Sequence, residues 1–552
     1  MSIDKVTAEV IRNGLAAAGD AMFVTIEQTA RSPLLYASHD FAAGIVSAAG
    51  ELWGSAPGVG NFISALSDTI KSGIREIGLA SMGEGDVFVV NDPYETGTHI
   101  SDTSIYAPVF FQGELVGFSI VTAHWSDIGG KTPSGWCADS TSVYQEGLCF
   151  SHQRIVRAGE RDADWLRFVA ANVRFPETVL ADLDAQFAAC HQGAVRLRAL
   201  CERYGADLVR QSMDYVIERS RESIRARVAA LPDGIYAESL QLDHDGVDPD
   251  SAPVVSVQVT IAGDSLAVSF DGSSPATKGP INNPGAQHDT FCALKGLLAP
   301  EELDNEGYRQ AFDLRIEPGL IVSPLRPAAV DSYGYVGIAV IELVIRAMAG
   351  ALPGKTPAAG FQIYSGQLSR ADPSHGSTFS MNDLCPGGAG ARPDGDGPQL
   401  VFVGNGDTPV TPVEVIEATY PVRCQRAELM PELAGHGKWR GGAGTRRDYV
   451  ILEEGISLDV SNQNVEHTLA QGVHGGGDGL PSRTVINPTT PDEVVIPDRI
   501  HIESLKVGDV ISSQRGGGGG YGDPKDRDRD RIADDIKQGY LTPEVARDVY
   551  GY

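Results

Sequence analysis

The stretch VFFQGELVGFSIVTAHW, residues 109–125, carries the strongest fold signal in this chain. It places apolar runs on either side of Gln112-Gly113, and such a pair favours a tight turn between antiparallel strands. The stretch VVSVQVTIAGDSLAVSF, residues 254–270, shows the same arrangement around Gly263-Asp264. Because hairpins pair antiparallel strands, the two stretches predict an α+β fold: a large, mixed, multi-segment molecule with an antiparallel, β-rich core.

N-terminal helices and a helical insert are predicted around the first hairpin. Apolar residues recur every three to five positions over residues 3–30 and again over residues 60–80, which is typical of helices with one buried face. Residues 161–231 hold few turn-forming residues and a break at Pro176, so a helical insert is expected there. The resulting division is residues 1–160, an α+β region; 161–231, a helical segment; 232–515, a β-rich core with a buried helix at 337–352; and 516–552, a glycine-rich loop with a helical tail.

The charge balance restricts the classes of partner. The chain has 552 residues with 44 basic and 73 acidic side chains, and its net charge is −29 at pH 7. A field of this sign repels phosphate backbones and anionic lipids, so no nucleic-acid partner and no membrane binding are expected. No run approaches the about 18 apolar residues of a spanning helix. The N-terminus lacks the layout of a signal peptide, so the predicted location is the cytoplasm.

Side chains able to bind a metal gather in one N-terminal part of the sequence. His99 and Asp102 are three positions apart in GTHISD, His124 and Asp127 are three apart in AHWSDIGG, and Asp40 offers a carboxylate upstream. Imidazoles combined with carboxylates suit zinc, manganese or ferrous iron, since each accepts mixed nitrogen and oxygen ligands. The spacing alone leaves ordinary core or loop histidines open as an alternative, because the chain has 12 histidines.

Glycine-rich runs are the second distinctive feature. RGGGGGYGDP (515–524), HGGGDG (474–479) and WRGGAG (439–444) lack the Gly-Lys-Ser/Thr ending of a phosphate-binding loop, so we predict turn and packing roles for them. No GxSxG or HExxH motif supports a hydrolase mechanism of those types. The 7 cysteines form no CxxC pair, which argues against a disulfide framework and a cysteine-built zinc site.

Several motifs together resemble a known family. NDPYETGTHISD (91–102), AHWSDIGG (123–130) and GGGGYGDP (517–524) are similar to motifs of the B subunits of the hydantoinase/oxoprolinase superfamily, also called N-methylhydantoinase beta-type subunits. Related chains occur in ATP-dependent caprolactamase and in acetone and acetophenone carboxylases. The chain departs from the family pattern at Trp125, where a second histidine is usual and a changed pocket wall is expected, and at His436.

The resemblance implies a metal-binding subunit of a two-protein enzyme. Carried over residue by residue, Asp40, His99, Asp102 and His124 would hold one divalent metal, zinc, manganese or iron, in the N-terminal region. A hydantoinase A-type ATPase partner would bind ATP and Mg²⁺, in a hetero-oligomer such as one with two copies of each subunit. The substrate would be a small cyclic amide: a hydantoin, a lactam or an oxoproline-like ring. The partner would phosphorylate its carbonyl oxygen, and metal-bound hydroxide would attack the activated carbon.

Two further carboxylates are candidates for acid–base catalysis. Asp127 lies three residues after His124 and is expected to act as a base or to orient that ring. Glu146 in YQEG is the weaker candidate, and a structural hydrogen-bonding role is equally open for both. Two other functions stay open. One is a subunit of an ATP-dependent ketone carboxylase, which bicarbonate-dependent ATP turnover would reveal, and the other is a non-catalytic scaffold for the A-type partner.

Overall fold

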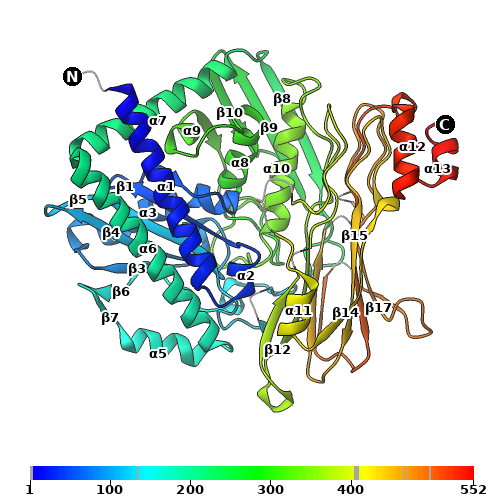
Figure 1. Ribbon diagram of the computed structural model, residues 1–552, viewed down its shortest axis with the longest axis horizontal. Coiled ribbons are helices and arrows are strands. Elements are labelled where there is room, and N and C mark those ends of the chain that lie inside the picture. The colour runs from blue at the N-terminus through cyan, green and yellow to red at the C-terminus, as the bar shows by residue number, and fades with distance from the viewer. Residues whose placement is uncertain are drawn as a thin grey trace.

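The computed structural model describes residues 4–133, 136–383, 385–402, 409–463, 465–467, 469–496 and 499–552. Within these residues the chain forms four β-sheets and confirms the α+β class. Figure 1 shows the first sheet and its long helices on one side of the molecule and the last strands of the chain on the other. In the described residues, no helix combines the length and apolar character needed to cross a membrane.

The first sheet has seven strands in the order β2-β1-β5-β4-β3-β6-β7, and all neighbours are antiparallel. The strands are β1 (Phe41–Ser47), β2 (Leu52–Ser55), β3 (Val87–Val90), β4 (Asp102–Phe111), β5 (Glu114–His124), β6 (Gln153–Arg157) and β7 (Glu160–Arg161). The predicted hairpin is confirmed as β4 and β5. Its turn residues Gln112 and Gly113 have φ angles of 52° and 82°, as the tight turn of a twisted hairpin requires.

Helices cover both faces of this sheet. On one face lie α1 (Lys5–Thr29), α6 (Pro176–Tyr204) and α7 (Ala206–Val228), and on the other lies α3 (Gly60–Ile77). Val121 packs with α1 and α6, whereas its neighbour Ile120 packs with Leu66 of α3, because successive residues of a strand point to opposite faces. β5 is therefore buried over nearly its whole length, and its last residue, His124, ends inside the molecule.

The helical segment shares the core of the N-terminal region. α5 (Ala163–Asn172), α6 and α7 confirm the predicted helices, and α6 begins at Pro176, where the break was expected. Val169, Leu183 and Met213 from these helices belong to the same apolar cluster as α1 and the first sheet. The predicted domain boundary at residue 160 stays a prediction, and a single apolar core spans it.

The second sheet has the order β11-β10-β9-β8, with β10 and β11 parallel and the other neighbours antiparallel. Its strands are β8 (Gly234–Gln241), β9 (Val254–Ala262), β10 (Ser265–Ser269) and β11 (Phe312–Arg315). It packs with α8 (Ala286–Leu298) and α10 (Gly334–Met348) in a second apolar cluster. The buried helix predicted at residues 337–352 is α10, which begins three residues earlier and ends four residues earlier. The short helix α9 (Glu306–Arg309) lies beside α7.

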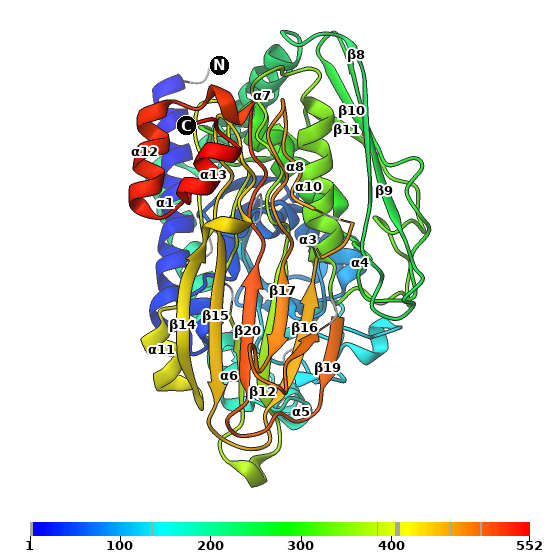
Figure 2. The ribbon, with the colours of Figure 1, turned by 90° about the vertical axis from the view of Figure 1, so that its right-hand side faces the viewer.

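The strands of two further sheets face the viewer in Figure 2, and the two sheets share one apolar cluster. The third sheet contains β13 (Phe379–Asn382), β12 (Tyr364–Arg370), β16 (Ser457–Asn462) and β19 (Arg499–Ile502), in that order. The fourth contains β14 (Val422–Met430), β15 (Gly444–Ile451), β20 (Val510–Arg515), β17 (Arg483–Ile486) and β18 (Val494–Ile496). Leu458 and Val460 of the third sheet pack against Ile451 and Ile511 of the fourth. The opposite face of the third sheet is polar.

The glycine-rich runs pack against one another next to these sheets. Gly518 donates to the carbonyl of Gly442 at 3.0 Å and accepts from Gly435 at 2.8 Å, and Gly520 donates to the Gly477 carbonyl at 2.8 Å. Such backbone contacts between neighbouring segments leave no room for side chains. The predicted packing role is confirmed. The tail helices α12 (Arg529–Gln538) and α13 (Pro543–Asp548) follow, and Thr542 caps α13 by accepting from the Val545 N–H.

The glycine-rich runs around Gly442, Gly477 and Gly518 pack together in what we call the glycine layer. Adding one methyl group there should disrupt the packing of these runs. A Cβ on Gly518 would stand 1.9 Å from the carbonyl oxygen of Ala389, so Gly518→Ala is expected to destabilise the protein by several kcal/mol, ~4 or more. The matched control is Gly296→Ala in α8, where a Cβ would meet no atom within 4 Å. Because alanine favours helix, the control should be neutral or stabilise by about 1 kcal/mol. Thermal unfolding of both variants checks this, and equal melting temperatures would contradict it.

Candidate metal centre

The register of β4 and β5 builds the centre. Asp102, the first residue of β4, pairs with His124, the last residue of β5. His99 precedes Asp102 in a turn closed by the Asp102 N–H on the His99 carbonyl at 3.1 Å. The turn follows α4 (Pro93–Thr96) and passes through Gly97, whose φ is 74° and whose absent side chain leaves room for the His288 ring. Sequence spacing and strand register thus bring three side chains to one point.

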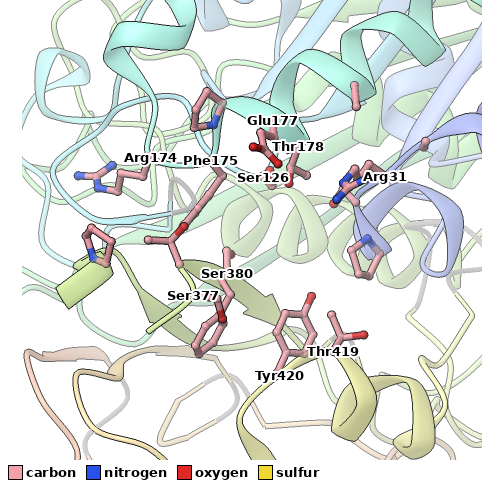
Figure 3. Close-up of a pocket in the computed structure, with 18 of the residues that line it drawn as sticks. Arg31, Ser126, Arg174, Phe175, Glu177, Thr178, Ser377, Ser380, Thr419 and Tyr420 are labelled. Carbon is pink, nitrogen blue, oxygen red and sulfur yellow. The ribbon is translucent and has the colours of Figure 1, made fainter. Parts of the chain in front are cut away.

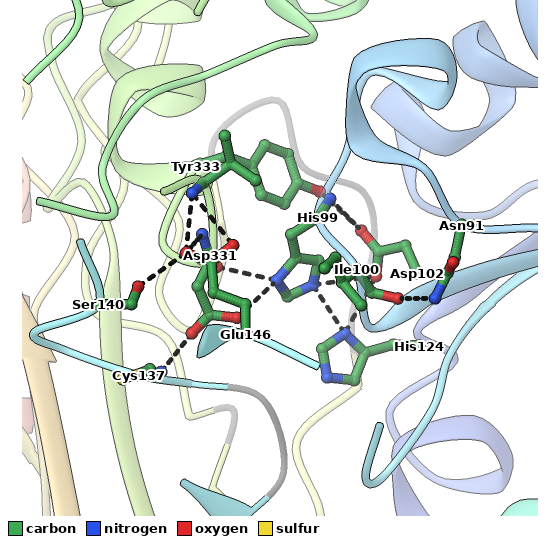
Figure 4. A network of polar contacts seen from close by, with 11 residues as sticks. Asn91, His99, Ile100, Asp102, His124, Cys137, Ser140, Glu146, Asp331 and Tyr333 are labelled. Atoms are coloured by element: carbon green, nitrogen blue, oxygen red, sulfur yellow. Dashed lines mark hydrogen bonds and ion pairs between the residues drawn. The ribbon is translucent and has the colours of Figure 1, made fainter. Parts of the chain in front are cut away.

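Three atoms capable of binding a metal form a tight triangle (Figure 4). His99 Nε2 lies 3.1 Å from Asp102 Oδ1 and 3.1 Å from His124 Nδ1, and His124 Nδ1 lies 3.0 Å from Asp102 Oδ1. Metal–ligand bonds of about 2.1 Å at right angles separate two ligand atoms by about 3 Å. The triangle therefore has the spacing of three adjacent ligands on one ion. All three residues are at most 2% exposed.

A hydrogen bond sets the orientation of the His99 ring. His99 Nδ1 donates to the backbone carbonyl of Asp331 at 2.8 Å, an oxygen that can only accept. The proton of a neutral ring therefore sits on Nδ1, and the lone pair of Nε2 points into the triangle. Asp102 is held in a similar way, because the Tyr333 hydroxyl donates to its Oδ2 at 3.3 Å and accepts from Asn61 at 3.1 Å.

The electrostatics of the triangle favour a cation. Burial disfavours the charged form of His99, but Asp102 and Asp331 together outweigh burial and raise the pKa of His99 well above its usual value. Burial likewise acts to raise the pKa of Asp102, and His99 and His124 outweigh it and lower that pKa. Without a metal the triangle retains a proton between its members, and metal binding is expected to release that proton. His124 Nε2 is buried and has no hydrogen-bond partner among the described residues.

Asp40, the fourth expected ligand, lies beside the triangle. Phe41 begins β1 opposite Ala123, so Asp40 is next to His124, whose N–H donates to the Asp40 carbonyl at 3.1 Å. Burial raises the pKa of the Asp40 carboxyl. His124 acts to lower that pKa, whereas the Asp102 carboxylate acts to raise it further. In the described residues the set of ligand atoms within 4.8 Å of one another includes His99, Asp102 and His124 but not Asp40. A ligand role for Asp40 stays a prediction.

Glu146 holds the backbone segment that orients His99. Its Oε1 accepts from Ser140 Oγ at 2.7 Å and from the backbone N–H groups of Val330 and Asp331 at 2.9 and 3.0 Å. It thereby fixes the segment whose carbonyl orients His99 (Figure 4). Sequence reasoning missed Asp331 and Tyr333, because they lie more than 200 residues from His99 and carry no spacing signal.

Asp127 is engaged elsewhere. One carboxylate oxygen accepts from Arg174 Nη1 at 3.0 Å and from the Gly129 N–H at 3.3 Å, and the other accepts from the Arg174 N–H. The ion pair fastens the DIGG turn to the segment before α6. These contacts favour the structural role that the sequence left open, and a catalytic role for Asp127 stays a prediction without a contact to the triangle.

A large open cleft begins two residues after His124 (Figure 3). Its volume is about 1180 Å³, and it separates the start of α6 from β13 and the end of α11 (Val413–Thr419). Ser126 lines the cleft, is 6% exposed, and has an Oγ without a partner among the described residues. Arg31 and Arg174 make part of the wall positive (Figure 3).

The sequence matches a known family along nearly its whole length. The family model described as hydantoinase B/oxoprolinase covers residues 4–524. The chain belongs to the hydantoinase B/oxoprolinase family. One relative, named as the B subunit of a putative D-/L-hydantoinase in Pseudomonas sp. (strain NS671), is 30% identical, and the match covers 100% of this chain and 95% of that protein.

Two solved structures share the fold of this chain. The ATP-dependent caprolactamase of Pseudomonas jessenii matches with a TM-score of 0.93 and 26% sequence identity, over 100% of this chain and 96% of that one. An acetone carboxylase in its nucleotide-free form matches with a TM-score of 0.88 and 19% identity, over 99% of this chain and 79% of that one. At that identity the second likeness concerns the fold alone.

The two departures from the hydantoinase B pattern have structural explanations. Trp125 lies in the apolar core, and its indole N–H donates to Gln186 Oε1 at 2.9 Å, so the expectation that it changes a pocket wall is wrong. It points away from His124 because adjacent residues at the end of β5 face opposite ways. His436 lies 3.2 Å from the Tyr550 hydroxyl and joins the glycine layer to the C-terminal tail.

Proposed function

We propose that this chain is the metal-bearing B subunit of an ATP-dependent enzyme that opens cyclic amides. The observation that carries the proposal is the buried triangle of His99, Asp102 and His124, whose spacing suits one divalent ion. Family membership supports the reaction class, since relatives are named as the B subunit of a putative hydantoinase and as an ATP-dependent caprolactamase. Zinc, manganese and iron all accept this ligand set.

The protein's own groups would prepare the site for hydrolysis. The Asp331 carbonyl keeps the His99 lone pair directed into the triangle, and the Tyr333 hydroxyl holds the Asp102 carboxylate in place there. A divalent metal held by these three residues would lower the pKa of water toward about 7 and would so supply a nucleophile at neutral pH. Burial of the triangle excludes bulk water, which strengthens each of these electrostatic contacts.

ATP chemistry is assigned to a separate A-type partner. The glycine-rich runs lack a phosphate-binding motif, and backbone N–H groups such as those of Gly518, Gly519 and Gly520 already donate to carbonyl oxygens within the protein. Activation of a resonance-stabilised amide by phosphorylation therefore needs another chain. The 30% identical relative is itself named as one subunit of an enzyme, which supports a hetero-oligomer whose stoichiometry stays open.

A ketone carboxylase component is the second candidate. Its support is the shared fold with an acetone carboxylase, which matches at lower identity and over a smaller share of that chain than the caprolactamase does. Bicarbonate distinguishes the two functions, because a carboxylase consumes it and a hydrolase ignores it. ATP turnover that requires bicarbonate and a ketone would favour the carboxylase.

The proposed function makes a direct prediction about metal and partner. Purified with its A-type partner, the chain is expected to carry close to one zinc, manganese or iron per copy and to open a hydantoin or lactam in the presence of ATP. Alone, it should hydrolyse neither ATP nor amide. Elemental analysis and a cyclic-amide screen check both statements. Full activity after complete removal of metal would leave only the scaffold function.

A further inference from the structure

The third sheet has a polar face that is buried. Gln367 of β12 pairs with Asp459 of β16, whereas the next pair along the strands is Leu368 with Leu458. The leucine face packs on the fourth sheet. The other face carries Gln367, Asp459 and Ser461, which are 0%, 3% and 4% exposed. Antiparallel sheets usually bury one apolar face and leave the polar face in water, so burial of this face needs an explanation.

Several atoms on this face lack partners within the described protein. Gln367 Oε1, Asp459 Oδ2 and Ser461 Oγ are buried and form no hydrogen bond with the described residues. The other polar atom of two of these side chains is engaged, since Gln367 Nε2 donates to Ser380 Oγ at 2.9 Å and His501 Nδ1 lies 2.8 Å from Asp459 Oδ1. Protein interiors rarely leave polar atoms unmatched unless a ligand or ordered water completes them.

The polar face lies toward the metal centre. Asp459 interacts electrostatically with Asp331, whose carbonyl orients His99. The Tyr335 hydroxyl, two residues after Tyr333, donates to the Ser461 carbonyl. The metal centre has an unmatched atom of its own beside it: the indole N–H of Trp136 is buried without a partner among the described residues. The ring of Trp136 lies 5.5 Å from the His99 ring and 6.1 Å from the His124 ring.

We propose that Gln367, Asp459 and Ser461, together with the indole N–H of Trp136, recognise the hydrogen-bonding edge of the substrate ring at the metal centre. This inference rests on the proposed function and specifies its substrate. Gln367 Oε1 and Asp459 Oδ2 accept hydrogen bonds, Trp136 donates, and Ser461 does both. Such a set matches an uncharged ring with N–H and C=O groups beyond the reacting amide, as in a cyclic ureide. A simple lactam has one N–H and one C=O, and both belong to the reacting amide.

Substitution of Gln367 tests the assignment. Gln367→Met keeps the size of the side chain and removes the unmatched oxygen. In the metal-loaded complex with the A-type partner, KM for a five-membered cyclic ureide is expected to rise at least tenfold. KM for a lactam of the same ring size should change far less. A lactam lacks the extra N–H and C=O groups, so it forms no hydrogen bond with Gln367 Oε1 in the wild type either. Metal content should stay at the wild-type level.

Thermal unfolding separates recognition from a structural role. The substitution Gln367→Met removes the hydrogen bond to Ser380 Oγ, but it also removes the buried, unmatched Gln367 Oε1. The melting temperature should therefore fall little. The matched control is Ser369→Ala on the same face, where Ser369 Oγ is satisfied by Ser457 Oγ at 2.8 Å. The control should melt earlier and keep the wild-type KM. Trp136→Phe, which keeps an aromatic ring beside the histidines, should raise KM for the ureide independently of Gln367.

Each outcome decides between the proposals. Unchanged KM for the ureide in both Gln367→Met and Trp136→Phe overturns the proposal that these residues recognise the substrate and leaves the proposed function intact. A wild-type complex that opens neither ring overturns the proposed function and, with it, the proposal on substrate recognition. The melting-temperature rise that the ureide causes in metal-loaded wild type gives a second readout without turnover. That rise should shrink in Gln367→Met and persist in Ser369→Ala.

Discussion

Replacing His124 by alanine is expected to abolish metal binding and nearly all coupled turnover. His124 Nδ1 supplies one corner of the triangle, 3.0 Å from Asp102 Oδ1 and 3.1 Å from His99 Nε2. Two remaining ligands would hold a divalent ion far more weakly than three. Elemental analysis of the purified variant measures the loss. The metal-free variant should melt somewhat below the metal-free wild type, because the substitution also removes the contact of His124 Nδ1 with buried Asp102 Oδ1, so metal content and not melting temperature decides the assignment.

A second buried histidine provides the matched control. His152 is 5% exposed, and its two ring nitrogens lie 3.0 Å from the Tyr106 hydroxyl and 3.0 Å from Ser72 Oγ. His152→Ala should lower the stability by about 1–3 kcal/mol, since it leaves the buried Tyr106 hydroxyl without this partner, and should leave metal content unchanged. A His124 variant that behaves like the His152 variant, destabilised with full metal, rejects the ligand assignment.

Two substitutions of Glu146 are expected to differ sharply. Glu146→Ala leaves the N–H groups of Val330 and Asp331 and the Ser140 hydroxyl without their acceptor. It should cost about 3 kcal/mol or more of stability and weaken metal affinity by about 10–100-fold, because the carbonyl that orients His99 loses its support. Glu146→Gln keeps Oε1 as an acceptor. If Glu146 only positions this segment, the glutamine variant should retain metal and most of the activity.

The pH dependence of the glutamine variant checks the same role. Burial, followed by the Asp331 carboxylate, raises the pKa of Glu146 to about 8. The folded state therefore binds more protons than the unfolded state between about pH 4.5 and 8, and wild-type stability falls as pH rises through that range. Glutamine cannot ionise, so Glu146→Gln should gain stability relative to wild type from pH 5 to pH 8. Complete loss of turnover at full metal content would instead support the proton-transfer role considered from the sequence.

Local signals in the sequence predicted much of the fold. The hairpin of β4 and β5 was readable because strand alternation and the Gln112-Gly113 turn are properties of a few adjacent residues. The helices α1, α3 and α6 were readable from apolar periodicity. Their predicted limits moved by a few residues, as at α3, which ends at Ile77 rather than at residue 80, and at α10, whose limits moved by three and four residues. The glycine runs were correctly predicted as packing elements, although the close backbone contacts between distant runs required the structure.

The candidate site was also predictable only in part. His99, Asp102 and His124 were found from the sequence, because their motifs lie in two adjacent strands whose register follows from one hairpin. The sequence could not reveal that Asp331 and Tyr333 orient them, or that Arg174 occupies Asp127.

The sequence by itself determined the antiparallel hairpin and a group of metal-capable side chains that contains the triad His99, Asp102 and His124, since each depends on residues close together in the chain. The likeness to the family rests on motifs spread between residues 91 and 524. Only the tertiary structure decided which groups surround the triad. The loop before α10 reaches His99 because two separate apolar cores pack against each other, and the polar face of β12 and β16 is buried because the third sheet uses its leucine face for the fourth. Contacts of this kind depend on the packing of whole elements, for which adjacent residues carry no signal.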